Sequence, residues 1–239
     1  MKNKSIKELR EICQPAFKQV KENPYFRIHR RFFRIFSIYI TRFLIKIKFS
    51  ANLASYLGLI FGVIASLSFY YGKFLLGALI LQLWFLMDTL DGELARYYFS
   101  KNKKENYLIK GEYLDINSHH LVHSLIFISL GLSLFNLTKN LNFIYLGLTS
   151  VYSFLLNELI DLNKIKVLFY TNSKIKKIEL RKKKSLIKRF MIIYTFPATA
   201  NLILIFSIFD KINILTYFYG ITFPIIVFIK LIVNLARKW

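Results

Sequence analysis

Acidic side chains interrupt a long apolar stretch of this chain. No charged residue occurs between Phe74 and Met87, and Asp88 and Asp91 follow directly. An ionisable group inside an apolar helix costs free energy, which makes it a candidate functional residue. Carboxylate oxygens are hard ligands that suit Mg²⁺ or Mn²⁺, and these ions typically activate phosphate-containing substrates. The acids therefore predict a divalent-metal site.

The spacing around these acids predicts two helical stripes, because steps of three and four residues return to the same face of an α-helix. Small residues on the first stripe leave room for a ligand's base or sugar, and Arg96 offers a fork for phosphate oxygens. A competing interpretation makes the acids buried ion-pair partners, for instance Asp91 with Arg96. The first stripe consists of Asp88, Asp91, Gly92 and Ala95, and the second of Gly111, Asp115 and His119.

The helices that carry these stripes are expected to span a membrane. The chain has 239 residues, of which 55% are hydrophobic, yet its net charge is +22. Apolar segments of about 20 residues cross a bilayer, and basic residues gather in the segments between them. The sequence therefore predicts an all-α integral membrane protein. Its six transmembrane helices are predicted at residues 51–71, 74–98, 112–137, 141–161, 189–209 and 213–235.

Lys and Arg are distributed unevenly between the predicted connections. Thirteen precede the first span, five lie between Arg96 and Lys110, eleven between Lys164 and Arg189, and three at the C-terminal end, whereas the other three connections hold one each. Basic loops stay on the cytoplasmic side of a membrane. We therefore expect a multi-pass protein of the cytoplasmic membrane, with both termini and the acidic motif on the cytoplasmic side. The same rule accounts for the charge without a nucleic-acid partner.

Residues 1–49 are predicted to form an interfacial region that precedes a membrane domain of residues 50–239. Ser5 and Glu8 fit a capping box that opens a short helix. Beyond Pro24, arginines at helical spacing alternate with aromatic residues. This pattern is typical of an amphipathic helix on the cytoplasmic membrane surface, attracted by anionic lipid head groups, although a solvated basic helix is an alternative.

The two stripes resemble the signature of an enzyme family, the CDP-alcohol phosphotransferases of phospholipid biosynthesis. The family motif reads Asp-x-x-Asp-Gly-x-x-Ala-Arg, followed by Gly-x-x-x-Asp-x-x-x-Asp. Residues 50–55, which include Asn52, also resemble the start of the family's first span, and His119 stands where the family has its fourth Asp. The residues that match the motif are Asp88, Asp91, Gly92, Ala95, Arg96, Gly111 and Asp115.

The resemblance implies a metal-dependent transfer reaction. Members of this family move a phosphate-linked group from a CDP-alcohol, expected here to be CDP-diacylglycerol, to the hydroxyl group of an acceptor alcohol and release CMP. Their Asp residues hold one or two divalent ions, which implies that Asp88, Asp91 and Asp115 bind Mg²⁺ or Mn²⁺. The family often forms homodimers. The residues implied to bind the nucleotide and pyrophosphate are Asp88, Asp91, Gly92, Ala95, Arg96, Gly111 and Asn52.

His119 and the spacer before Gly111 depart from the family pattern. The spacer after Arg96 holds 14 residues, against about eight in the family, and a longer loop costs little. The family's fourth Asp is its proposed general base, and a neutral His suits proton abstraction near pH 7, so we predict that His119 is the base beside Asp115. As a metal ligand His119 is softer than Asp, which leaves one divalent site and makes a second an open question.

Three further histidines have structural as well as functional interpretations. His123 follows His119 by one helical turn, so the two could form a transition-metal pair, but a hydrogen-bonded core residue is more typical of this position. His120 is predicted to be structural, and His29 in the basic helix to be interfacial.

The acceptor site is expected near the cytoplasmic ends of the fourth and fifth spans. Lys188 and Arg189 could bind a phosphorylated acceptor, or they could belong to the basic loop alone. Asn157, Glu158 and Asp161 could hydrogen-bond an alcohol, or they could cap helix ends.

Three other functions fit parts of the pattern. A catalytically weakened homologue that binds nucleotide or CDP-lipid would explain His119. A transporter that uses the acids as an ion or proton relay gives no reason for the spacing of Gly92, Ala95 and Arg96. A membrane metallohydrolase would consume the CDP-lipid with water in place of an acceptor.

Overall fold

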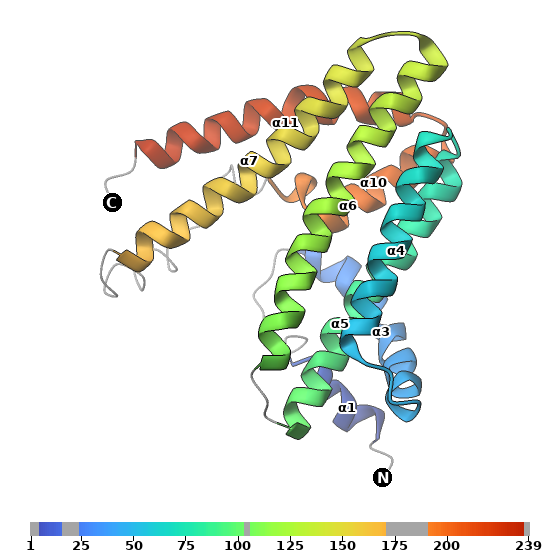
Figure 1. The fold of residues 1–239 in the computed structure, drawn as a ribbon, viewed down its shortest axis with the longest axis vertical. Coiled ribbons are helices and arrows are strands. Elements are labelled where there is room, and N and C mark those ends of the chain that lie inside the picture. Colours follow the sequence, from blue (N-terminus) through green and yellow to red (C-terminus); the bar gives the residue numbers. More distant parts are fainter. Residues whose placement is uncertain (1–4, 16–23, 103–105, 171–190, 237–239) are drawn as a thin grey trace. The chain divides into compact units, whose positions relative to one another are not determined.

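The computed structural model describes residues 5–15, 24–102, 106–170 and 191–236, and all regular structure in these ranges is helical (Figure 1). This confirms the prediction of an all-α protein. The helices in the first half of the chain are α1 (Ile6–Cys13), α3 (Pro24–Lys46), α4 (Ala51–Tyr70) and α5 (Phe74–Asn102). Those in the second half are α6 (Asn106–Thr138), α7 (Asn142–Tyr170), the 3₁₀ turn η1 (Met191–Tyr194), α10 (Phe196–Ile208) and α11 (Ile212–Leu235).

Five of these helices, α4, α5, α6, α7 and α11, are long and apolar enough to cross a membrane. They also expose large apolar side chains, for example Leu148 and Tyr152 on α7 and Ile225 and Phe228 on α11. Water does not tolerate so much exposed apolar surface, whereas lipid covers it. A helix satisfies its own backbone hydrogen bonds, as a lipid environment requires. These observations support a multi-pass membrane protein.

The predicted fifth span, residues 189–209, is not one continuous helix in the described part of the chain. η1 ends at Tyr194, Thr195 is extended, and α10 begins at Phe196 with Pro197 in its first turn. Proline has no N–H to donate and its ring crowds the preceding turn, which favours the start of a helix at Pro197. α11, by contrast, continues through Pro224. α10 has 13 residues and extends about 20 Å, less than the roughly 30 Å of a bilayer core.

The chain divides into two compact units. The first comprises Met1–Ser66 and Leu76–Val122, and the second comprises Leu67–Leu75 and His123–Trp239. The first unit therefore contains α1, α3, most of α4 and α5, and the beginning of α6. The motif acids all belong to this unit.

The N-terminal helix of the first unit begins with the predicted capping box. The Glu8 backbone N–H donates to Ser5 Oγ at 3.2 Å, and the Ser5 N–H donates to the Glu8 carboxylate at 3.0 Å. The apolar side of α1 then packs inward, with Leu9 and Cys13 buried against Ile38 of α3 and Tyr97 of α5. α1 is therefore packed against the helix that carries the acidic motif.

In the second unit, glycines let helix backbones approach closely. A Cβ atom added at Gly147 of α7 would lie 2.7 Å from the Phe127 carbonyl oxygen and 3.2 Å from Gly131 Cα on α6. The same contact seen from Gly131 places a Cβ 2.7 Å from the Phe143 carbonyl oxygen. Small residues at such crossings are what allow membrane helices to pack tightly.

Gly147→Ala is expected to destabilise the protein by about 1–3 kcal/mol, because the new methyl group meets backbone atoms that cannot move aside. Thermal unfolding of the detergent-solubilised protein measures the effect as a lower melting temperature. Gly111→Ala is the matched control, since a Cβ at Gly111 meets no atom within 4 Å. Equal melting temperatures for the two variants would contradict the close approach of α6 and α7.

Candidate metal centre

Two helices of the first unit bring three of the predicted ligands together. His119 Nε2 lies 2.8 Å from Asp88 Oδ1 and 3.2 Å from Asp115 Oδ1. The ligand atoms of the three side chains all lie within 4.8 Å of one another. Asp115 and His119 are one turn apart on α6, so they share a face, and Asp88 reaches them from α5. The side chains are partly exposed, His119 to 26% and Asp88 to 25%, so a ligand from outside can reach them.

Trp84 packs against this centre and was not singled out from the sequence. It precedes Asp88 by one turn of α5, it is 2% exposed, and its ring lies edge-on to the His119 imidazole with centroids 4.7 Å apart. Such edge-to-face packing restricts the rotation of the imidazole ring. In the sequence, only its position on the same helical stripe as Asp88 points to a role at this centre. An aromatic residue at such a position is usually interpreted as part of the core.

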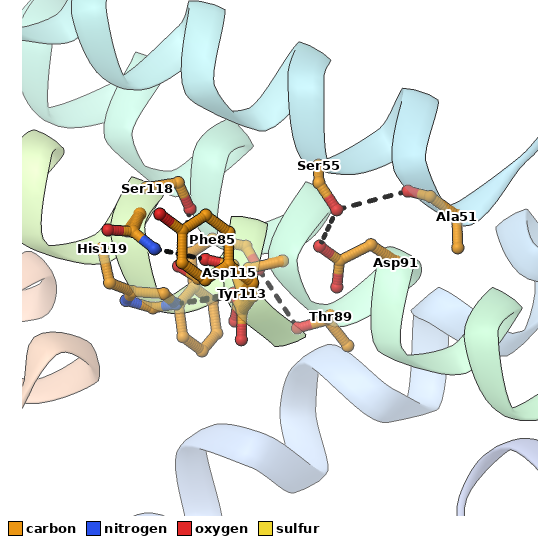
Figure 2. A network of polar contacts seen from close by, with 11 residues as sticks. Ala51, Ser55, Phe85, Thr89, Asp91, Tyr113, Asp115, Ser118 and His119 are labelled. Atoms are coloured by element: carbon orange, nitrogen blue, oxygen red, sulfur yellow. Dashed lines mark hydrogen bonds and ion pairs between the residues drawn. The ribbon is translucent and has the colours of Figure 1, made fainter. Parts of the chain in front are cut away.

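Asp91 is held by a different helix. The Ser55 hydroxyl of α4 donates to Asp91 Oδ2 at 2.6 Å and lies 3.3 Å from the Ala51 carbonyl oxygen. Figure 2 shows Asp91 beside Ser55, apart from Asp115 and His119. Ser55 belongs to the segment, residues 50–55, that resembles the start of the family's first span, and it binds Asp91. Asn52 lies one turn earlier and is half-buried, and no such hydrogen bond joins it to the other described residues.

Gly92, Ala95 and Arg96 of the motif lie against protein atoms, whereas Gly111 does not. Arg96 Nε donates to the Cys13 carbonyl oxygen at 2.5 Å, and the guanidinium passes beside Gly92, where a Cβ would lie 3.3 Å from Arg96 Nη1. Ala95 packs on the apolar cluster that contains Ala54 of α4. The structure therefore places the predicted phosphate fork at the end of α1, and Gly111 beside open space.

The predicted acceptor residues are placed only in part. Lys188 and Arg189 lie outside the described residues. In the second unit, Lys230 of α11 donates to Asn157 Oδ1 at 2.5 Å and lies 2.8 Å from Asp161 Oδ2. Asn157 Nδ2 also donates to Glu158 at 3.4 Å. These residues of α7 are not at a helix end, because α7 continues to Tyr170. Asn157 and Asp161 join α7 to α11 through Lys230.

The other histidines differ in their surroundings. His123 belongs to the second unit and is 1% exposed. Its ring is stacked on Phe154 with centroids 4.3 Å apart, and it meets Phe196 edge-on at the same distance. This packing is that of a core residue. His120 is half-buried, and the side chain of His29 lies outside the described part.

The separations in the Asp88, Asp115 and His119 group suit a divalent ion. In the structure His119 Nε2 is hydrogen-bonded to Asp88 Oδ1 at 2.8 Å and forms an ion pair with Asp115 Oδ1 at 3.2 Å. Bonds of about 2.0–2.1 Å place neighbouring ligands of an octahedral ion roughly 3.0 Å apart, a similar separation. The two carboxylates suit Mg²⁺ or Mn²⁺, and the imidazole, a softer donor, favours Mn²⁺ of the two. Neither a protein-family model nor a curated protein matches the chain.

Proposed function

We propose that this protein is a metal-dependent CDP-alcohol phosphotransferase of the membrane. It would transfer the phosphatidyl group of CDP-diacylglycerol to an alcohol acceptor and release CMP, a reaction of phospholipid biosynthesis. The observation that supports this proposal is the convergence of Asp88, Asp115 and His119 from two helices, at the offsets of the family motif. A relay for ions would need carboxylates along a path, and it would not need this cluster.

The three side chains would hold one Mg²⁺ or Mn²⁺ ion through Asp88 Oδ1, Asp115 Oδ1 and His119 Nε2. When bound, the ion supplies charge neutralisation for a pyrophosphate and for the CMP that leaves it. Asp91, oriented by Ser55, adds a further carboxyl group beside this centre. The side chains set the position of the reacting phosphates before reaction, which is the main contribution of a protein to phosphoryl transfer.

The geometry favours a ligand role for His119 over the predicted role of general base. A single nitrogen, Nε2, lies against both carboxylates. A lone pair that binds an ion is not available to accept a proton, so Nε2 cannot do both at the same time. The Trp84 ring also holds the imidazole in this direction. We therefore propose ligation by Nε2, with one ion in the centre.

The finer features of the membrane arrangement also belong to this proposal. We place α3 on the cytoplasmic membrane surface, because its outer side exposes Phe36, Tyr39 and Phe43 beside Arg42, a combination that suits anionic lipid. α10 would serve as the short sixth crossing, which puts both termini and the centre on the cytoplasmic side. A homodimer is part of the proposal by resemblance to the family.

The experiment that tests the function uses purified protein in detergent with labelled CDP-diacylglycerol and a panel of acceptors. The panel contains glycerol phosphate, inositol phosphate, serine, ethanolamine, choline and a sugar alcohol, each with Mg²⁺ and with Mn²⁺. We expect CMP release that requires one acceptor, stops with EDTA and returns when Mn²⁺ is restored. Soluble CDP-alcohols are tested in parallel as donors.

Each other outcome identifies a different function. Binding of CDP-lipid without turnover would indicate the weakened homologue, and metal-dependent CMP release without any acceptor would indicate a hydrolase. Movement of ions or protons across reconstituted vesicles, without CMP release, would indicate a transporter. All three results would contradict the proposal.

A further inference from the structure

Glu93 is a carboxylate that the structure buries completely within the motif helix. It follows Asp91 by two residues on α5, and its exposed fraction is 0%. Gln14 Nε2 and Ser37 Oγ donate to Glu93 Oε1 at 2.7 and 2.6 Å. Thr41 Oγ1 donates to Glu93 Oε2 at 2.6 Å. Burying a carboxylate is costly unless hydrogen bonds satisfy its oxygens, and three short charge-assisted bonds do so here.

The three donors come from the two N-terminal helices and are themselves buried. Gln14 caps the C-terminal end of α1 and is 2% exposed, and Ser37 and Thr41, one turn apart on α3, are 0% exposed. Apolar side chains, including Leu9 and Ile38, pack around them. The Glu93 carboxylate is satisfied inside this apolar cluster, although Gln14 Oε1 has no hydrogen-bond partner among the described residues. A buried carboxylate that needs these three donors tolerates few other arrangements, so it specifies how α1, α3 and α5 pack.

Arg96 makes a second attachment between the same helices. Its Nε donates to the carbonyl oxygen of Cys13, the residue before Gln14. Two consecutive residues at the end of α1 thus bind two residues of α5 that are separated by one turn, Glu93 and Arg96. Attachment at two points opposes rotation of α5 about its own axis as well as separation of the helices.

We propose that Glu93 is a positioning residue, which uses α1 and α3 to fix the rotation of α5 and therefore the direction of its metal-binding acids. At about 100° per residue, Glu93 lies roughly 140° from Asp88 and 160° from Asp91 around the helix. The helix is thus held on one side by Glu93 while its acids point to the other side. The expected effect on turnover rests on the proposed function. The expected effect on the packing of α1 and α3 against α5 does not.

The single thiol of the chain reports on the docking. Cys13 is the only cysteine in the sequence and is 0% exposed, so a maleimide reacts with it only when α1 separates from α3 and α5. Thr41→Val keeps the shape of the side chain but removes the donor to Glu93 Oε2, and Thr41→Ser keeps the donor. We expect maleimide to label Thr41→Val about tenfold faster than the wild type, and Thr41→Ser at nearly the wild-type rate.

Two readouts then test whether docking positions the acids. We expect Thr41→Val to bind Mn²⁺ about tenfold more weakly in an EPR titration, and to show a kcat about tenfold lower per folded molecule with little change in the KM for CDP-diacylglycerol. Thr41→Ser should resemble the wild type in both. Glu93→Gln, which removes the charge, should change in the same direction as Thr41→Val.

The outcomes separate this inference from the proposed function. Equal labelling rates for Thr41→Val and the wild type would contradict the claim that the hydrogen bonds to Glu93 hold α1 and α3 against α5. Faster labelling with unchanged Mn²⁺ affinity and kcat would reduce Glu93 to a purely structural residue and overturn its positioning role. A wild-type protein without turnover would refute the proposed function. The Mn²⁺ affinities of the wild type and of Thr41→Val would still show whether Glu93 positions the metal-binding acids.

Discussion

Asp88→Asn is expected to lower metal-dependent CMP release by about 10³-fold, because an amide cannot supply the charged oxygen that a divalent ion requires. A loss of this size corresponds to about 4 kcal/mol of transition-state stabilisation. Asp88 Oδ1 is the closest carboxylate oxygen to His119 Nε2, at 2.8 Å, so removing its charge affects the whole group. The measurements are kcat at saturating Mn²⁺ and the Mn²⁺ affinity by EPR.

Asp210→Asn is the matched control for this change of charge. Asp210 is exposed, lies between α10 and α11, and has a backbone φ of 53°, a left-handed conformation that Asn adopts as readily as Asp. We expect its turnover and Mn²⁺ affinity to equal those of the wild type. If Asp88→Asn kept turnover near that of Asp210→Asn, the proposed metal centre would be wrong.

Changing His119 is expected to have the second largest effect and to separate its two candidate roles. His119→Asn should lower kcat by about 10²-fold, the usual contribution of a single catalytic group. If Nε2 is a metal ligand, excess Mn²⁺ restores part of this activity, because the variant only binds the ion more weakly. If His119 is the general base, no metal concentration restores it. Full turnover of His119→Asn with metal bound would exclude both roles.

His119→Asp is the informative partner of that variant, because it gives this position the Asp found in the motif that the sequence resembles. A carboxylate is a harder ligand than an imidazole, so we expect the ratio of Mg²⁺-supported to Mn²⁺-supported turnover to rise about tenfold. The loss of the edge-on contact with Trp84 should cost some stability, which thermal unfolding measures separately. An unchanged metal preference would show that His119 does not bind the ion.

The sequence predicted the helical class, five of the long apolar helices and the pairing of Asp115 with His119, because these depend on local periodicity. Two residues one turn apart on the same helix share a face whatever surrounds them. Asp88 and Asp91 were also assigned to one stripe, yet three residues correspond to a rotation of about 60° around a helix axis. That difference is enough for Asp88 to meet α6 while Asp91 meets Ser55 of α4.

Partners distant in the sequence could not be predicted in this way. Arg96 binds the carbonyl oxygen of a residue 83 positions earlier, and Glu93 binds Gln14 across 79 positions. Both contacts depend on how α1 packs against α5, which no local spacing encodes. From the sequence alone, Glu93 is an unremarkable polar residue between motif positions. The break at Pro197 had a local signal, but the apolar run on both sides outweighed it.

The pairing of Lys230 with Asp161 and Asn157 has a consequence for how the protein is made. A lysine raises the free energy of inserting an apolar helix into a bilayer, and Lys230 lies in the last such helix, with its side chain 14% exposed. α7 leaves the ribosome before α11, so the oxygens that receive Lys230 are in place when α11 arrives. We therefore expect insertion of α11 to depend on α7 that is already in the membrane, which would make the order of synthesis part of the folding of the second unit.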